Sequence, residues 1–339
     1  MIMKRLKIVI YVLMLTAIQS RAQDPNFSQF FSSPLNVNPA LTANINADWR
    51  AIANFRDQWI SPASPYATGT ISYDSKMFQK KFPGMEEGNI FGLGGMLMYD
   101  KAMGGVVNSS YASLNMSYRV KLSDGDTKHR LGAGFGAIYG YRRIDFAGID
   151  FEEQFTGYGF NTNLPTGENS LSSMKPYFSV STGLLYSITS ANSNFDIGVS
   201  AFHVNKPKQT FLKDENQYLP MRKVIHANFE TFLSDRVVLS ANAIYQSQET
   251  ANYYSVGGAL GYYLPNNEDY MLNAGLWYWS KNAIIPYIGI SYKDYQFGLS
   301  YDVTISKLNR ATEKPKTWEL SLIVRGRRKP SYVIPCPWK

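Results

Sequence analysis

The 339-residue chain lacks the features of a disulfide-stabilised secreted domain and of a helical membrane protein. It has a single cysteine, Cys336, so an intrachain disulfide cannot form. After residue 22 no stretch approaches the run of about 18 apolar residues that a transmembrane helix needs. The formal net charge of +8 includes the cations of the N-terminus and is too small to predict nucleic-acid binding.

Recognisable catalytic motifs are absent too. The sequence contains neither GxSxG nor HExxH, and its histidines, His129, His203 and His226, lack metal-ligand spacing. One long predicted loop carries four acidic residues: Asp145, Asp150, Glu152 and Glu153. They could form an acid–base pair or a Ca²⁺ site, but a solvated loop face is the simpler interpretation. We therefore expect no enzymatic activity, no cofactor and no metal.

What the sequence does contain is a long alternation of side-chain types from Tyr295 to Ile305. Every second residue is apolar, and the residues between are polar or glycine. Period-2 alternation predicts an extended strand, and this one exceeds the usual soluble strand of about 5–6 residues. A strand that crosses a bilayer needs about 9–11 residues, with apolar side chains outward and polar ones inward. We therefore interpret this stretch as one strand of a closed barrel in lipid.

The same pattern recurs from residue 48 to residue 325 and predicts an all-β, transmembrane antiparallel barrel of about 14 strands. The strands are expected near Trp49–Asp57, Tyr66–Asp74, Asn89–Tyr99, Ser109–Leu122, Arg130–Arg143, Lys175–Thr189, Phe195–Asn205, Lys223–Leu233, Arg236–Ser247, Tyr253–Leu264, Met271–Tyr278, Ala283–Tyr292, Tyr295–Ile305 and Thr317–Arg325. An even number lets the last strand pair with the first, which removes exposed sheet edges.

Aromatic residues are abundant, with 24 tyrosines and 19 phenylalanines. They suit girdles at the two membrane interfaces, where an amphipathic ring lies at the headgroup level. The run Trp277–Trp279 is expected in the outer girdle. A large soluble β-sandwich or β-propeller is an alternative on composition alone.

Residues 1–22 have the pattern of a cleaved signal peptide. A positive n-region, an apolar stretch over residues 8–18 and small residues at Ser20 and Ala22 predict cleavage before Gln23. An uncleaved N-terminal anchor helix is the less favoured alternative.

Residues 23–47 are expected to form an irregular segment before the first strand. Proline breaks at Pro34 and Pro39 and weak alternation argue against a strand there. Three phenylalanines need burial and are expected to plug or line one end of the barrel: Phe27, Phe30 and Phe31.

The predicted connections are short at one end of the barrel and long at the other. With the N-terminus in the periplasm, the connections Ile144–Met174, Lys206–Arg222 and Ser306–Lys316 lie outside the cell. The longer inner connection Ser75–Gly88 is an exception without an explanation. Glycines inside the strands, among them Gly134, are expected to face the lumen or allow curvature.

A basic tail, residues 326–339, follows the last strand and is expected in the periplasm. Its cations could contact anionic headgroups, the tail could bind a periplasmic partner, or it could be a disordered end. We take eight residues as partner-binding candidates: Phe27, Phe30, Phe31, Arg325, Arg327, Arg328, Cys336 and Trp338.

Several segments resemble one family. The chain is similar to the PorP/SprF family of Bacteroidota over Gln23–Thr42, Tyr99–Val120 and Ala283–Leu308. Cys336-Pro337 resembles the Cys-Pro tail with which the family commonly ends, although Trp338-Lys339 departs from it. The resemblance implies an outer-membrane barrel of the type IX secretion system, which exports proteins and, in gliding bacteria, surface adhesins. The implied partners are other secretion components and cargo that carries a C-terminal secretion domain.

Three functions are therefore compared. The first is a non-enzymatic barrel in the lipid of the outer membrane that assists the secretion or surface attachment of one exported protein. The second is a diffusion porin, because 14 strands enclose a lumen. The third, an outer-membrane lipase or protease, needs a nucleophile beside a base, and the scattered histidines give no such pair.

Overall fold

A computed structural model of the chain describes residues 24–60, 65–78, 88–123, 125–145, 149–167, 174–209, 217–265, 267–306 and 315–327. The predicted signal peptide, most of the connection Ser75–Gly88 and residues 328–339 of the tail lie outside these residues. Among the described residues, no helix is both long and apolar enough to cross a membrane.

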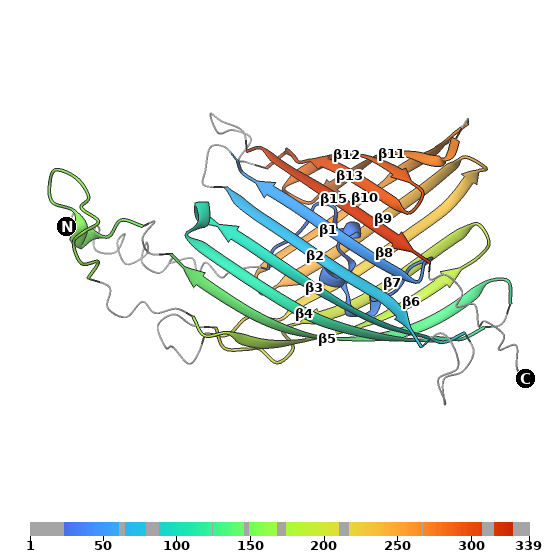
Figure 1. Cartoon of the computed structure of the whole chain (residues 1–339), viewed down its shortest axis with the longest axis horizontal. Helices are drawn as coiled ribbons and strands as arrows, with labels where there is room; N and C mark the ends of the chain where they lie inside the picture. The colour runs from blue at the N-terminus through green and yellow to red at the C-terminus, as the bar shows by residue number, and fades with distance from the viewer. Residues whose placement is uncertain are drawn as a thin grey trace, which may run out of the picture.

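The strands form a closed antiparallel barrel (Figure 1). They are β1 Trp49–Gln58, β2 Tyr66–Met77, β3 Ile90–Ala102, β4 Val107–Lys121, β5 Lys128–Ile144, β6 Tyr177–Thr189, β7 Ser193–Phe202, β8 Arg222–Ser234, β9 Val237–Gln248, β10 Ala251–Leu264, β11 Asn267–Trp279, β12 Ala283–Tyr292, β13 Tyr295–Tyr301, β14 Val303–Thr304 and β15 Thr317–Gly326. β13 and β14 are one strand divided at Asp302, so the barrel has 14 strands.

Closure occurs between the first and last strands. β1 pairs with β15 from Trp49↔Gly326 to Gln58↔Thr317, and every other strand pairs with its neighbours in chain order. The predicted all-β barrel, its strand number and its antiparallel closure are confirmed. Several strands run two to four residues beyond the predicted bounds, as β11 does at Asn267, because hairpin pairing continues past the apolar stretch into water.

The two faces of the wall differ as the alternation predicted. On β13, Phe297 and Leu299 point outward and are 43% and 36% exposed, whereas Ser300 between Leu299 and Tyr301 points into the lumen and is 1% exposed. The outward side chains lack protein neighbours because lipid surrounds this face.

The two ends of the barrel differ in their connections. At one end, called here the short-turn end, tight turns join β6 to β7, β8 to β9 and β12 to β13. At the other, called the long-connection end, long segments join β5 to β6, β7 to β8 and β14 to β15. Three connections at the long-connection end are nevertheless short, those after β3, β9 and β11. In outer-membrane barrels the long connections face outside the cell.

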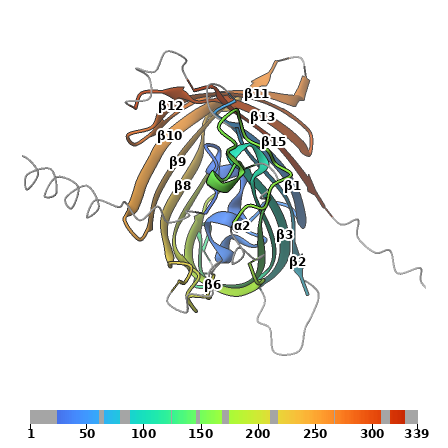
Figure 2. The same cartoon turned by 90° about the vertical axis from the view of Figure 1, so that its left-hand side faces the viewer.

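The N-terminal segment, residues 24–47, lies inside the barrel (Figure 2). It contains three short helical turns: η1 Phe30–Ser32, α2 Pro34–Val37 and η2 Pro39–Leu41. The prolines begin α2 and η2, where a missing backbone N–H costs no hydrogen bond. The remaining helical turns, η3 Met103–Gly105 and η5 Glu152–Gln154, lie in connections at the long-connection end.

Candidate functional site

The N-terminal segment crosses the lumen from end to end. Asp24 lies beside His203, Arg222 and Gln248, which border the long-connection end. Asn44, twenty residues later, bonds to Asp196 near the start of β7, at the short-turn end. The chain therefore enters the lumen near the long-connection end and runs through it to the short-turn end, where β1 begins and returns in the opposite direction.

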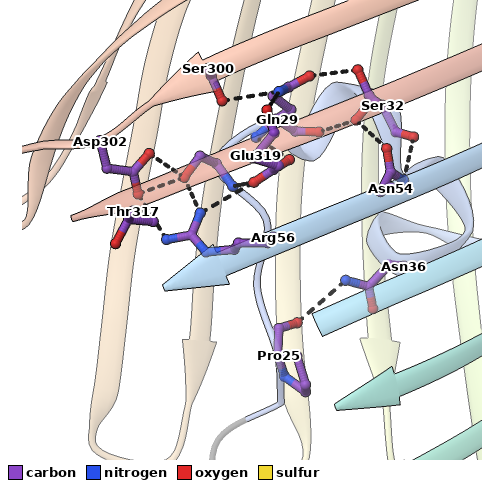
Figure 3. Close-up of polar contacts among 12 residues, drawn as sticks. Pro25, Gln29, Ser32, Asn36, Asn54, Arg56, Ser300, Asp302, Thr317 and Glu319 are labelled. Atoms are coloured by element: carbon purple, nitrogen blue, oxygen red, sulfur yellow. Dashed lines mark hydrogen bonds and ion pairs between the residues drawn. The ribbon is translucent and has the colours of Figure 1, made fainter. Parts of the chain in front are cut away.

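A buried charge cluster holds the upper part of this segment (Figure 3). Arg56 of β1 forms ion pairs with Asp302 at 2.8 Å and with Glu319 of β15 at 3.2 Å. One guanidinium thus bridges two buried carboxyl groups. The backbone N–H groups of Ser28 and Gln29 donate to the two Glu319 carboxylate oxygens, at 2.8 and 3.0 Å. These hydrogen bonds fix the segment to the wall.

The side chain of Gln29 extends the same cluster. Its Nε2 donates to Ser300 Oγ at 3.0 Å and to the Glu319 carbonyl oxygen at 2.9 Å, and its Oε1 accepts from Ser321 Oγ at 2.7 Å. Gln29 is 1% exposed. A buried amide with these partners avoids the penalty of an unsatisfied polar group.

A second anchor lies at the long-connection end. His203 Nε2 lies 2.8 Å from Asp24 Oδ2, and Arg222 Nε lies 3.2 Å from the same oxygen. Arg222 Nη2 also donates to the Asn36 carbonyl at 3.0 Å, and the guanidinium stacks 4.1 Å above the Phe202 ring. Charged and hydrogen-bonding groups of the wall thus hold the start of the segment.

A third anchor lies near the short-turn end. The Ala43 backbone N–H donates to Asp74 at 2.6 Å, and Asp74 also pairs with Arg50 at 2.7 Å. Arg119 donates to the Ala43 carbonyl and to Asn44 Oδ1. Cations on the wall therefore bind the carbonyl side of the segment, and a carboxylate binds its N–H side.

Asn38 fixes the middle of the segment. Its Nδ2 donates to the carbonyl oxygens of Leu184 and Val199, at 3.1 and 3.3 Å, and lies 3.0 Å from His226 Nε2. Its Oδ1 accepts from the Ala40 N–H at 2.8 Å, which caps η2.

Inward-facing glycines make room for this middle part. A Cβ added at Gly134 would meet the backbone of Pro39 and Ala40, and one at Gly183 would meet Asn38. Gly134 faces the lumen, as expected from the sequence. Glycine repeated at every second residue of a strand was the sequence signal for a close approach to that face.

The predicted aromatic candidates lie in the lumen, against the barrel's own wall. Phe27 and Phe30 are 3% and 5% exposed, and Phe31 stacks on Trp277 at 4.7 Å. Phe27 belongs to a different apolar cluster from Phe30 and Phe31, so the structure does not bring all three together. Their predicted role in binding a partner stays a prediction.

The expected outer girdle at Trp277–Trp279 was wrong for its two tryptophans. Trp277 and Trp279 are 2% and 9% exposed and point into the lumen, whereas Tyr278 is 38% exposed and points outward. Consecutive strand residues alternate between faces, so the three rings cannot share one girdle.

The basic candidates lie at the short-turn end, apart from the aromatic ones. Arg325 points into the lumen and donates to Gln296 Oε1 at 2.9 Å, and Arg327 is exposed after β15. Arg328, Cys336 and Trp338 lie outside the described residues.

Sequence reasoning missed the charged residues that hold the segment: Asp24, Arg56, Asp74, Arg222, Asp302 and Glu319. A signal for those on the strands was available, because a charged residue at an inward position of a membrane strand is costly unless it has a partner. The partners of these charged residues could not be identified from the sequence, because contacting residues such as Ser28 and Glu319 lie 291 positions apart.

Comparison with known proteins identifies a family over most of the chain. The model of a family described as type IX secretion system membrane protein PorP/SprF matches residues 19–324. None of the curated proteins matches the chain.

Solved barrels resemble the chain at low identity. The toluene transporter TodX of Pseudomonas putida is 11% identical, with 86% of this chain and 92% of that chain covered and a TM-score of 0.47. For the CymD monoaromatic hydrocarbon channel these values are 10%, 88%, 93% and 0.46. For the translocator domain of autotransporter NalP from Neisseria meningitidis they are 10%, 84%, 90% and 0.34. None of these likenesses bears on what this chain binds.

Proposed function

We propose a function from one premise: the chain belongs to the PorP/SprF family of type IX secretion system membrane proteins, and its barrel crosses the outer membrane many times. The proposed role is that of a non-enzymatic accessory barrel. It assists the secretion or the surface attachment of one exported protein, such as a gliding adhesin that carries a C-terminal secretion domain.

The observation that carries this proposal is the filled lumen. Residues 24–47 cross the barrel interior and are anchored near both ends, by Asp24 and by Ala43. A segment anchored across the lumen blocks free diffusion through it, which leaves the ends and the outer wall as the surfaces for partners. Such a barrel suits a receptor or anchor better than a conduit.

The two ends are proposed to meet different partners. The long connections at the outer end would receive the exported protein. At the short-turn end, Arg325 and Arg327 would contact other secretion components or anionic headgroups, together with Arg328, Cys336 and Trp338. Phe27, Phe30 and Phe31 would reach a partner only if the segment left the lumen.

The alternative is a diffusion porin. It uses the same barrel but requires a continuous aqueous path, and the buried segment occupies that path. Planar-bilayer recordings of the purified protein separate the two functions: we expect no steady conductance, and a stable open channel would favour the porin.

Deletion of the gene tests the secretion role directly. We expect one large exported protein to stay inside the cells or to be released into the medium, while the other exported proteins reach the surface as before. Comparing surface-labelled and medium proteins by mass spectrometry gives the result. Normal surface display of every exported protein in the deletion strain would refute the proposal.

A further inference from the structure

The connection between β5 and β6 contains a self-supported unit at the long-connection end (Figure 1). Gln154 is its centre and is 4% exposed. Gln154 Oε1 accepts from the Phe151 N–H at 3.1 Å, and Gln154 Nε2 donates to the Leu164 carbonyl at 3.0 Å. The Asn161 N–H donates to the Gln154 carbonyl at 2.8 Å. These bonds join the two sides of the unit to each other.

The middle of the unit is a tight turn from Phe155 to Phe160, which forms its tip. These two residues form an antiparallel bridge, and the Thr156 N–H donates to the Gly159 carbonyl at 3.0 Å. Gly157 has a φ of +84°, a left-handed conformation that glycine adopts without strain. The backbone of the turn is therefore fixed by its own hydrogen bonds.

This turn presents aromatic side chains to solvent. Phe155 and Phe160 are 55% and 53% exposed, with ring centroids 5.2 Å apart, and Tyr158 between them is fully exposed. Burying such a side chain is worth about 1.5–3 kcal/mol. An ordered turn that holds three rings in water, here called the aromatic tip (Phe155, Tyr158 and Phe160), is a surface suited to a protein partner.

The charge around the aromatic tip indicates the kind of partner. Residues 149–167 contain Asp150, Glu152 and Glu153 and no lysine or arginine. Glu152 and Glu153, which begin η5 directly before Phe155, are exposed. An acidic surface is repelled by the phosphates of an outer-membrane leaflet. It is complementary to a protein surface with lysine or arginine, whose cations also bind aromatic faces.

We propose that the aromatic tip, with Glu152 and Glu153, binds the exported protein through a basic surface that places lysine or arginine beside an apolar pocket. This inference rests on the proposed function, because it takes the exported protein as the occupant. It goes further by naming the binding surface and the chemistry of the partner.

The test uses the full-length protein in cells that lack the native gene. The triple variant F155S/Y158S/F160S removes the rings, and Y218S removes an exposed ring from another connection at the same end, where Tyr218 is 44% exposed. The measured quantity is the surface-held fraction of the exported protein that gene deletion mislocalises. We expect the triple variant to lower this fraction about tenfold, since aromatic anchors dominate interfaces, and Y218S, a single ring on another long connection, to lower it far less.

Charge variants identify the class of partner. E152K/E153K is expected to lower the surface-held fraction about as far as the triple variant, and E152Q/E153Q to lower it less, because reversal adds repulsion. An unchanged fraction in both the triple and the lysine variants would overturn the inference. Loss with the triple variant alone would overturn the basic partner, and a gain with E152K/E153K would indicate a lipid surface instead.

Controls keep this test separate from the proposed function. The amount of each variant in the outer membrane and its heat-modifiable folding are measured first. If the triple variant fails to assemble, E152K/E153K still tests the surface, because it changes only exposed side chains. If gene deletion itself mislocalises no exported protein, the proposed function fails. If deletion mislocalises one and the folded variants hold it normally, only the aromatic tip is refuted.

Discussion

The outward and inward faces of the barrel come from the same strands but are specified differently. On β12, Ile288 points outward, is 61% exposed and has only a general apolar requirement. On β1, Arg56 points inward, is 2% exposed and is held by Asp302 and Glu319. Lipid accepts many apolar side chains, whereas each buried charge in the lumen needs its own partner at hydrogen-bonding distance.

This difference determines how a substitution should act. An outward change within the apolar class keeps its environment, because lipid tails adapt to shape. An inward change meets the N-terminal segment, which is anchored near both ends and in the middle. The comparison between the faces can therefore be tested with matched pairs of variants.

The largest effect is expected for Arg56→Met. The change leaves the carboxylates of Asp302 and Glu319 buried without a cation, which should cost about 3–5 kcal/mol of unfolding free energy. Denaturant titration in detergent micelles measures the loss. Phe55→Leu, at the outward neighbour of Arg56, should cost less than about 1.5 kcal/mol. Equal losses for the two variants would contradict a special role for the inward charge.

A large effect on the outward face requires a change of chemical class. Ile288→Arg places a charge toward the lipid tails near the middle of β12 and should cost about 2–4 kcal/mol. Ile288→Val should cost less than about 1.5 kcal/mol. The same titration in lipid nanodiscs checks both, and a tolerated arginine would mean that this face does not contact lipid.

A smaller effect is expected where the wall meets the middle of the segment. Gly134→Val would force a side chain into the backbone of Pro39 and Ala40, and overpacking of this kind costs about 1–3 kcal/mol. Ala133→Val adds methyl groups to the preceding residue, which faces outward. A lower temperature for the heat-dependent gel shift should appear for Gly134→Val alone.

The smallest effect is expected at the start of the segment. Asp24→Asn keeps the shape but removes the charge that pairs with Arg222 and His203, which should cost about 1–2 kcal/mol. Because the other anchors remain, the barrel should stay folded while the outer part of the segment loosens. Brief channel openings in planar-bilayer recordings should then become more frequent than in the unsubstituted protein. An unchanged frequency of openings would mean that the Asp24 anchor does not keep the lumen closed.

Period-2 patterns could predict the wall because its requirements are local. The stretch from Tyr295 to Ile305 indicated which side chains face out, and the structure agrees. The same rule places Trp277 and Trp279 on one face and Tyr278 on the other, as in the structure. Aromatic content alone, on which the expected girdle depended, does not say which face a ring takes. Alternation alone could not say that Trp277 would stack on Phe31 from the N-terminal segment.

The sequence by itself determined the strands, their number, the outward apolar face and the antiparallel closure, since each follows from neighbours along the chain and from the uniform chemistry of lipid. Only the tertiary structure decided that residues 24–47 cross the lumen from the long-connection end to the short-turn end. That path depends on contacts such as Ser28 with Glu319 and Asn38 with His226, separated by 291 and 188 positions. Such contacts leave no local periodicity, because the chain must close into a barrel before the inward groups can meet.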